Sequence, residues 1–247
     1  MLNAEKIFSI VAGLASIAGL VLYLMFEHPM KGWIGVAFLV LMAGYVAYQV
    51  LRALDHVIKL KYPHGYTKLA SFARYSCFDG KSIEYSIHKL IQAKTPLLRS
   101  IEHNFKWSGT NRPTVDCAPH KLSGIDYLGS EFDWDKVRIQ LSETILYNQV
   151  VVIPIKMVID DCDQKSGPYV SHRVDEPSQL ISWRVELGVN KDRSGMPAQL
   201  CRKPVHSEHD SAWELLWLVN YHSIKQSYET EIICPKMGYH YRLSWDR

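Results

Sequence analysis

The 247-residue sequence is poor in cysteine and carries little net charge. Its five cysteines are odd in number and widely spaced, and no two form a CxxC pair. This arrangement suits neither a disulfide framework nor a zinc site, and it favours a reducing compartment. A net charge of +3 also argues against a general binder of duplex nucleic acid, which needs a basic surplus to neutralise many phosphates.

Motifs of catalysis and cofactor binding are also missing from the sequence. There is no P-loop, no GxGxxG after a predicted strand and no pair of carboxylates with assignable acid and base roles. The cluster His206 to Asp210 has the residue types of a metal site or a hydrolytic triad, but neighbours in sequence rarely converge on one atom. We therefore predict no catalytic residues, no metal and no cofactor. A hydrolase that uses His206, His209 or Asp210 is a rival hypothesis.

Long apolar runs, in contrast, are present at the N-terminus. Residues Ile7 to Phe26 and Trp33 to Leu51 contain no Asp, Glu, Lys, Arg or His and are separated only by Glu27 to Gly32. Each run, as a helix rising about 1.5 Å per residue, is long enough to cross a hydrocarbon core of about 30 Å. The sequence predicts a two-helix transmembrane hairpin with the lipid bilayer as partner. A cleavable signal peptide is the alternative for the first run, although that run exceeds a usual signal core and a second run follows directly.

The charges around the two runs predict their orientation. Arg52, Lys59 and Lys61 follow the second run, whereas the connecting loop holds only Lys31, offset by Glu27. The positive-inside rule places both termini in the cytoplasm. The absence of ionisable residues within the runs argues against a transporter or an ion-selective channel.

Small residues recur at helical spacing in both runs. In the first run they would form one stripe, and in the second they are four apart, a pattern that permits close helix packing within a chain or between protomers. The predicted packing residues are Ser9, Ala12, Gly13, Ser16, Gly19, Ala43 and Ala47.

The sequence Tyr62-Pro63-His64-Gly65 predicts the end of the second helix, because proline disfavours helical geometry in the preceding residue and glycine permits a turn. We expect residues 1–61 to form the hairpin with a cytoplasmic exit helix. Residues 62–247 would form a β-rich cytoplasmic sensor domain.

Apolar residues alternate with polar ones through most of this second part, as in the set Ile101, His103, Phe105 and Trp107. A period of two is typical of strands, and about nine short strands separated by turn residues predict an all-β domain, either a β-sandwich or a small β-barrel. Short helices are expected near 67–74 and 123–132. The other predicted strands are 82–92, 137–141, 145–159, 170–174, 180–187, 212–219, 223–234 and 239–245.

Aromatic and cationic side chains of the β-rich part are candidates for ligand recognition. Aromatic faces can stack nucleobases and guanidinium groups match phosphates, although alternation predicts that most of these aromatics lie in the core. The candidate ligand-binding residues are Lys106, Trp107, Tyr169, Arg173 and Arg242.

The two apolar runs, the break at Tyr62 to Gly65 and the strand-rich remainder together resemble the bacterial two-transmembrane, β-strand-rich effectors of cyclic-oligonucleotide antiphage defence. The resemblance is one of architecture over the whole chain, and no nucleotide-binding motif can be matched residue by residue. It implies a homo-oligomeric inner-membrane effector, whose β domain senses a cyclic nucleotide and whose hairpin disrupts the membrane. The alternative is a membrane-tethered protein-binding or adaptor module without membrane-disrupting activity.

Overall fold

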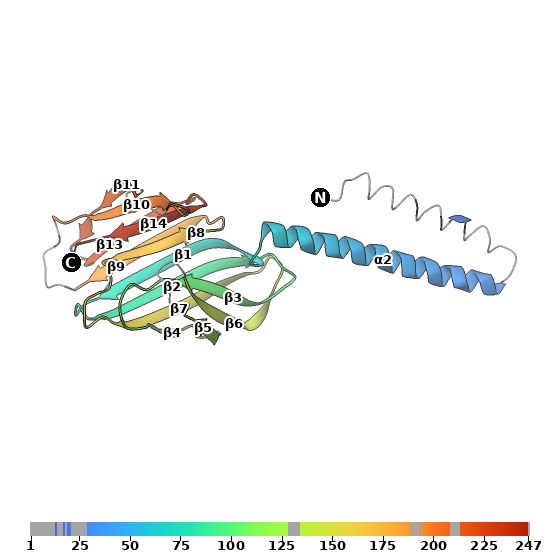
Figure 1. The fold of residues 1–247 in the computed structure, drawn as a ribbon, viewed down its shortest axis with the longest axis horizontal. Helices are drawn as coiled ribbons and strands as arrows, with labels where there is room; N and C mark the ends of the chain where they lie inside the picture. Colours follow the sequence, from blue (N-terminus) through green and yellow to red (C-terminus); the bar gives the residue numbers. More distant parts are fainter. Residues whose placement is uncertain are drawn as a thin grey trace. The chain divides into compact units, whose positions relative to one another are not determined.

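The computed structural model describes Gly13, Ile17, Gly19, Leu20 and residues 29–127, 134–188, 193, 195–207 and 213–246 (Figure 1). The chain divides into two compact units, Met1–Leu60 and Lys61–Arg247. The first unit is helical in its described residues, and the second contains all the strands.

Helix α2 spans Pro29–Lys61. Its 33 residues correspond to a length of about 50 Å at 1.5 Å per residue, which exceeds the hydrocarbon thickness of a membrane. Within Gly35–Lys61, an 18-residue window has a mean hydropathy of 1.6 and contains no buried residue. The stretch is therefore long and apolar enough to cross a bilayer. An ion pair of 2.7 Å between Lys59 Nζ and Asp55 Oδ2 marks the polar C-terminal third of the helix.

The predicted two-helix hairpin is wrong. Only α2, among the residues that the structure describes, is a helix of membrane-crossing length, so the multi-pass topology with both termini in the cytoplasm is unsupported too. Most of the first apolar run, including Ser9, Ala12 and Ser16, lies outside the described residues. Length and hydropathy report only whether a segment could span a membrane, which is why two similar runs gave the wrong expectation.

The predicted small-residue packing stays a prediction, and its described members are exposed in the single chain. Gly13 and Gly19 are exposed, and no described atom lies within 4 Å of the place where a Cβ would be added. Ala43 and Ala47 of α2 are exposed as well.

The helix ends where the sequence predicts. After Lys61, the Gly65 amide donates a hydrogen bond of 2.9 Å to the Tyr62 carbonyl, which closes a turn. Gly65 has a φ of +74°, a backbone conformation that side chains with a Cβ rarely adopt. The turn leads directly into the first strand.

The second unit is an all-β domain, as predicted, with three sheets in its described residues. A seven-stranded sheet has the order β12-β13-β9-β1-β2-β7-β4, and two smaller sheets have the orders β11-β10-β14-β8 and β3-β6-β5 (Figure 1). The strands are β1 Tyr66–Cys77, β2 Ser82–Ala93, β3 Leu97–Phe105, β4 Thr114–Asp116, β5 Lys121–Asp126, β6 Asp135–Leu146, β7 Val150–Asp160, β8 Tyr169–Val174, β9 Leu180–Leu187, β10 Ala198–Pro204, β11 Glu214–Val219, β12 Tyr221–His222, β13 Ser227–Ile233 and β14 Tyr239–Ser244.

One hydrophobic core joins the three sheets. Alternate residues of β2 and β3 point into it, together with inward residues of β9 and β14 such as Trp183 and Leu243. The sheets keep separate edges instead of closing on themselves, so the domain is a sandwich of open sheets and not a barrel. Burial of this shared apolar face is the main force that holds the sheets together.

Several local predictions were wrong. The helix expected at 67–74 lies within β1, which pairs with β2 on one side and with β9 in parallel on the other. The helix expected at 123–132 begins inside β5, and β10 was not predicted. Pairing with neighbouring strands overrides the weak local preference of such segments.

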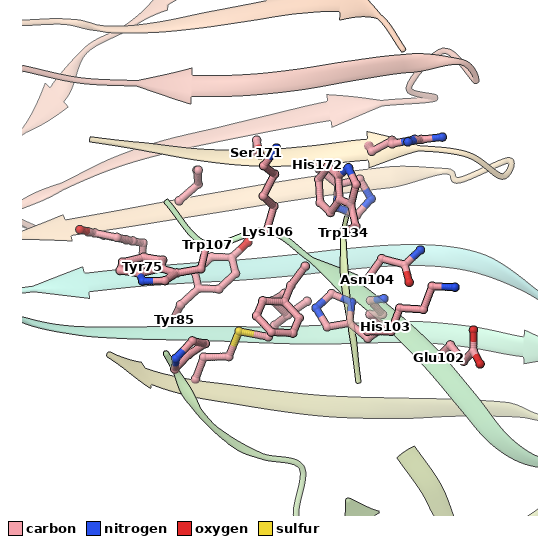
Figure 2. A pocket seen from close by; sticks show the side chains of 18 of the residues that line it. Tyr75, Tyr85, Glu102, His103, Asn104, Lys106, Trp107, Trp134, Ser171 and His172 are labelled. Atoms are coloured by element: carbon pink, nitrogen blue, oxygen red, sulfur yellow. The ribbon is translucent and has the colours of Figure 1, made fainter. Parts of the chain in front are cut away.

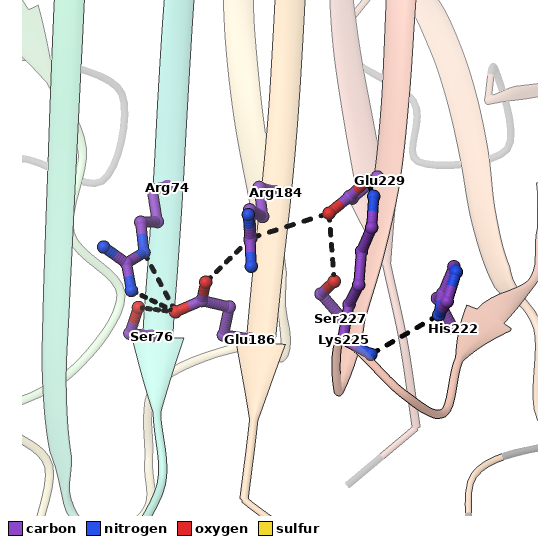
Figure 3. Close-up of polar contacts among 8 residues, drawn as sticks. All are labelled: Arg74, Ser76, Arg184, Glu186, His222, Lys225, Ser227 and Glu229. Atoms are coloured by element: carbon purple, nitrogen blue, oxygen red, sulfur yellow. Dashed lines mark hydrogen bonds and ion pairs between the residues drawn. The ribbon is translucent and has the colours of Figure 1, made fainter.

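A polar network on the outer face of the large sheet links β1, β9 and β13 (Figure 3). Glu186 Oε2 accepts hydrogen bonds from Arg74 Nη2 at 2.6 Å and from Ser76 Oγ at 2.8 Å, while Oε1 lies 2.7 Å from Arg184 Nε. Burial alone would raise the pKa of Glu186, but the bonds from Arg74 and Ser76 outweigh it and the pKa is lowered. The network holds β1 and β9 together at the centre of the sheet. The opposite face of β1 lines the site described next.

Candidate functional site

A cavity of about 370 Å³ lies between the large sheet and the two smaller sheets. Its floor comes from β1, β2 and β7, and its walls come from β3 and β8 with the segments that follow them (Figure 2). Because β3 and β8 belong to different sheets and do not pair, they leave space above β1 and β2. The volume is within the range of small-molecule sites.

Two buried basic side chains define one end of the cavity. Lys89 is 4% exposed and follows Ile87 on the inward face of β2, where the next inward residue is Ile91. His103 is 6% exposed, and neither of its ring nitrogens has a hydrogen-bond partner among the described residues. Lys89 and His103 each occupy an inward position where the neighbouring inward residues of the strand are apolar. A buried polar group without a partner costs stability.

Lys68 of β1 and His172 of β8 complete this basic end, and Figure 2 shows His103 and His172 both reaching into the cavity. Burial, followed by the positive charges of Lys68 and Lys89, lowers the pKa of His172 to about 3. The pKa values of Lys89 and His103 are lowered well below their ordinary values, first by burial and then by neighbouring positive groups. The cluster therefore suppresses its own positive charge.

Aromatic side chains gather at the other end. Tyr75, Tyr85 and Trp107 lie together in Figure 2, away from His103. Tyr85 and Lys89 are four residues apart on one face of β2, which corresponds to about 13 Å along the strand. Trp107 Nε1 is buried without a hydrogen-bond partner. One end of the cavity thus holds Tyr75, Tyr85 and Trp107, whereas His103 lies toward the other end, with the Phe105 ring stacked on it at 6.4 Å between centroids.

The loops that carry two aromatic residues of the cavity are joined. The Gly167 amide donates a hydrogen bond of 2.9 Å to Ser108 Oγ, which ties the segment after Trp107 to the segment before Tyr169. Gly109 lies so close to the Trp107 ring that an added Cβ would be 2.6 Å from it. The absence of a side chain at Gly109 lets this ring pack against the backbone.

Four of the five predicted ligand-binding residues line this cavity, namely Lys106, Trp107, Tyr169 and Arg173. Arg173 is already paired, since its Nε lies 2.5 Å from Asp175 Oδ1. Arg242 is not part of the lining. Its guanidinium lies 4.0 Å from the Trp213 ring centroid and 5.6 Å from that of Tyr169, so it acts as a packing group beside the cavity.

Lys68, Lys89 and His172 were not predicted as site residues, and His103 was predicted only as part of a strand. The sequence contained a signal for Lys89, because Lys89 occupies the next inward-facing position of the strand after Tyr85 and Ile87. A base at an inward position of an apolar strand indicates a polar cavity.

No group of three or more His, Cys, Asp and Glu side chains suited to a metal ion occurs within the described parts of the chain. His206 lies in a turn after β10, and His209 and Asp210 are outside the described residues. The acidic segment that begins at Asp160 forms a turn at the end of β7. In this turn the Ser166 amide donates a hydrogen bond of 2.9 Å to Asp161 Oδ1.

Comparison with known proteins gives no family. No protein-family model and no curated protein matches the chain. Similar solved structures include an M1 zinc metallopeptidase from Deinococcus radiodurans, with a TM-score of 0.37 and 8% identity over 73% of this chain and 42% of that one. A putative protease from Parabacteroides distasonis has a TM-score of 0.40 and 7% identity over 74% and 40%. Yeast LTA4 hydrolase has a TM-score of 0.41 and 9% identity over 74% and 29%. The chain spans less than half of these proteins, and likeness at this level carries no argument about function.

Proposed function

We propose that the β domain is a sensor that binds a small anionic ligand of the nucleotide class in the cavity between the sheets. The observation that carries this proposal is a single cavity lined by both aromatic rings and buried bases. Aromatic side chains such as Trp107 suit a nucleobase, and the basic end suits phosphate. The architectural resemblance noted from the sequence favours a cyclic nucleotide.

We further propose that α2 anchors this sensor to a membrane as a single helix. The apolar stretch of the helix and its lack of buried surface support an anchor. Because the structure contradicts the hairpin, the proposal does not include membrane disruption by a hairpin. Binding at the cavity is the core of the proposal.

Thermal unfolding of the full chain in detergent tests it. The panel contains cyclic dinucleotides and trinucleotides, linear mononucleotides and uncharged nucleosides. At a concentration about 100 times the Kd, a ligand of the native state adds about 2.7 kcal/mol, so a cyclic nucleotide should raise Tm by about 5 °C or more. Uncharged nucleosides should have little effect.

A matched pair of variants locates the effect. Trp107→Leu should remove most of the rise in Tm, because it deletes a ring from the cavity. Trp217→Leu should keep the rise, because Trp217 lies on β11, is 42% exposed and does not line the cavity. A panel in which no nucleotide raises Tm, or equal loss in the two variants, would contradict the proposal.

A further inference from the structure

The basic end of the cavity has an unusual composition for a protein interior. Lys89 and His103 are both more than nine-tenths buried, and both ring nitrogens of His103 lack a partner in the part of the chain that the structure describes. Lys68 of β1 and His172 of β8 add two further bases to the same end of the cavity. Four bases around one space are stable together only if most are uncharged or an anion lies among them.

The acidic side chains near this cluster balance it only in part, since the charge of Glu176 acts to raise the pKa of Lys89 but does not offset burial. Glu176 is buried, and its Oε1 lies 3.0 Å from His64 Nε2. Asp175 is paired with Arg173. Glu102 also lines the cavity from β3, but it is exposed, so solvent screens its charge.

The remaining charged groups of the lining are also cationic. Lys136 of β6 also lines the cavity, so bases reach it from every sheet that encloses it. Tyr66 of β1 lies at this end as well, and burial followed by the charge of Glu176 raises its pKa, which keeps the phenol neutral. The charge that the cluster lacks is therefore negative.

We propose that Lys68, Lys89, His103 and His172 form a phosphate subsite that takes up protons when an anion binds. This inference deepens the proposed function and rests on it, since it assigns the phosphate end of the ligand and makes binding depend on pH. Without an anion, burial and neighbouring positive groups hold the pKa values of Lys89, His103 and His172 low. A bound phosphate favours the charged forms and raises those pKa values, so affinity increases as pH falls.

NMR of the histidine ring nitrogens tests this in the full chain, labelled with ¹⁵N-histidine and held in detergent. The probe is inorganic phosphate, with chloride at matched ionic strength as the reference. Phosphate should raise the pH at which the His103 and His172 rings titrate by about one unit or more, a tenfold change in their proton affinity. His88 is an internal control, because it is exposed on the other face of β2 and does not line the cavity.

Two lysine variants sharpen the test. Lys89→Met should at least halve the phosphate-induced shift of both rings. Lys156→Met should leave it unchanged, because Lys156 of β7 lies outside the lining and forms a surface ion pair of 2.8 Å with Glu84. Each variant counts only if its His88 signal shows a folded domain.

The outcomes separate this inference from the proposed function. Phosphate that leaves both rings unchanged, or that shifts His88 equally, overturns the phosphate subsite even if a nucleotide raises Tm. Shifts of His103 and His172 that Lys89→Met reduces support the subsite even if no nucleotide in the panel binds, in which case the nucleotide class of the proposed function fails.

Discussion

The central feature at the scale of single residues is Lys89. A lysine on the inward face of a central strand loses hydration and gains no hydrogen bond from the described residues around it, so it lowers the stability of the free domain. His103 has the same character on β3. Destabilising polar groups that converge on one cavity are typical of functional sites, where stability is given up for binding.

Replacing Lys89 by methionine should therefore stabilise the ligand-free protein. Lys89→Met keeps the length of the side chain and removes the buried amine, so the free energy of unfolding should rise by roughly 1–3 kcal/mol, with a Tm increase of about 3 °C or more. Thermal and denaturant unfolding of the full chain in detergent would measure it.

The control for this prediction is Lys156→Met. It removes a lysine from a surface ion pair and should change stability by less than about 1 kcal/mol. A lower Tm for Lys89→Met than for wild type would show that the amine has a structural partner and would argue against a binding role.

At the scale of strands and turns, the cavity exists because two neighbouring walls belong to different sheets. β3 pairs with β6 and β8 pairs with β14, and both lie over β1 and β2 (Figure 1). The position of the first strand, and with it Lys68, depends on the turn at Gly65. That turn is tightly packed, because a Cβ on Gly65 would lie 2.8 Å from Thr95 Cγ2.

Gly65→Ala should destabilise the β domain by roughly 1–2 kcal/mol, since it adds backbone strain and a steric contact. Gly80→Ala is a matched control with the same kind of backbone, a φ of +73°, and no atom within 4 Å of the added Cβ. Chemical denaturation should show a larger loss for Gly65→Ala. Equal losses would mean that the contact with Thr95 contributes nothing.

The strands that the sequence predicted well are those with strict alternation. Leu180–Leu187 matches β9 at both ends, and the strand predicted from Ser82 extends one residue further as β2. β1 was missed because its polar and apolar residues do not alternate regularly and its conformation depends on pairing with β2 and β9. The site was predicted in part, because aromatic and cationic residue types were visible, whereas the convergence of β1, β2, β3 and β8 required the three-dimensional arrangement of the sheets.

At the scale of the whole molecule, the chain joins a long apolar helix to an all-β domain, and each unit is understood from its own residues. The all-β class followed from period-two patterns and turn residues. Hydropathy predicted two helices of membrane-crossing length, whereas the described residues contain one. We propose a tethered sensor. The ligand binds between the sheets of the β domain, and α2 anchors that domain to a membrane.

Hydrogen–deuterium exchange of the full chain in detergent, with and without a stabilising cyclic nucleotide, tests the central claim most directly. Bound ligand should slow exchange in peptides that cover residues 103–108 and 169–174, which line the cavity, and leave peptides from β10 and β11 unchanged. Protection confined to β10 and β11, or no protection of the cavity segments at saturating ligand, would contradict the account.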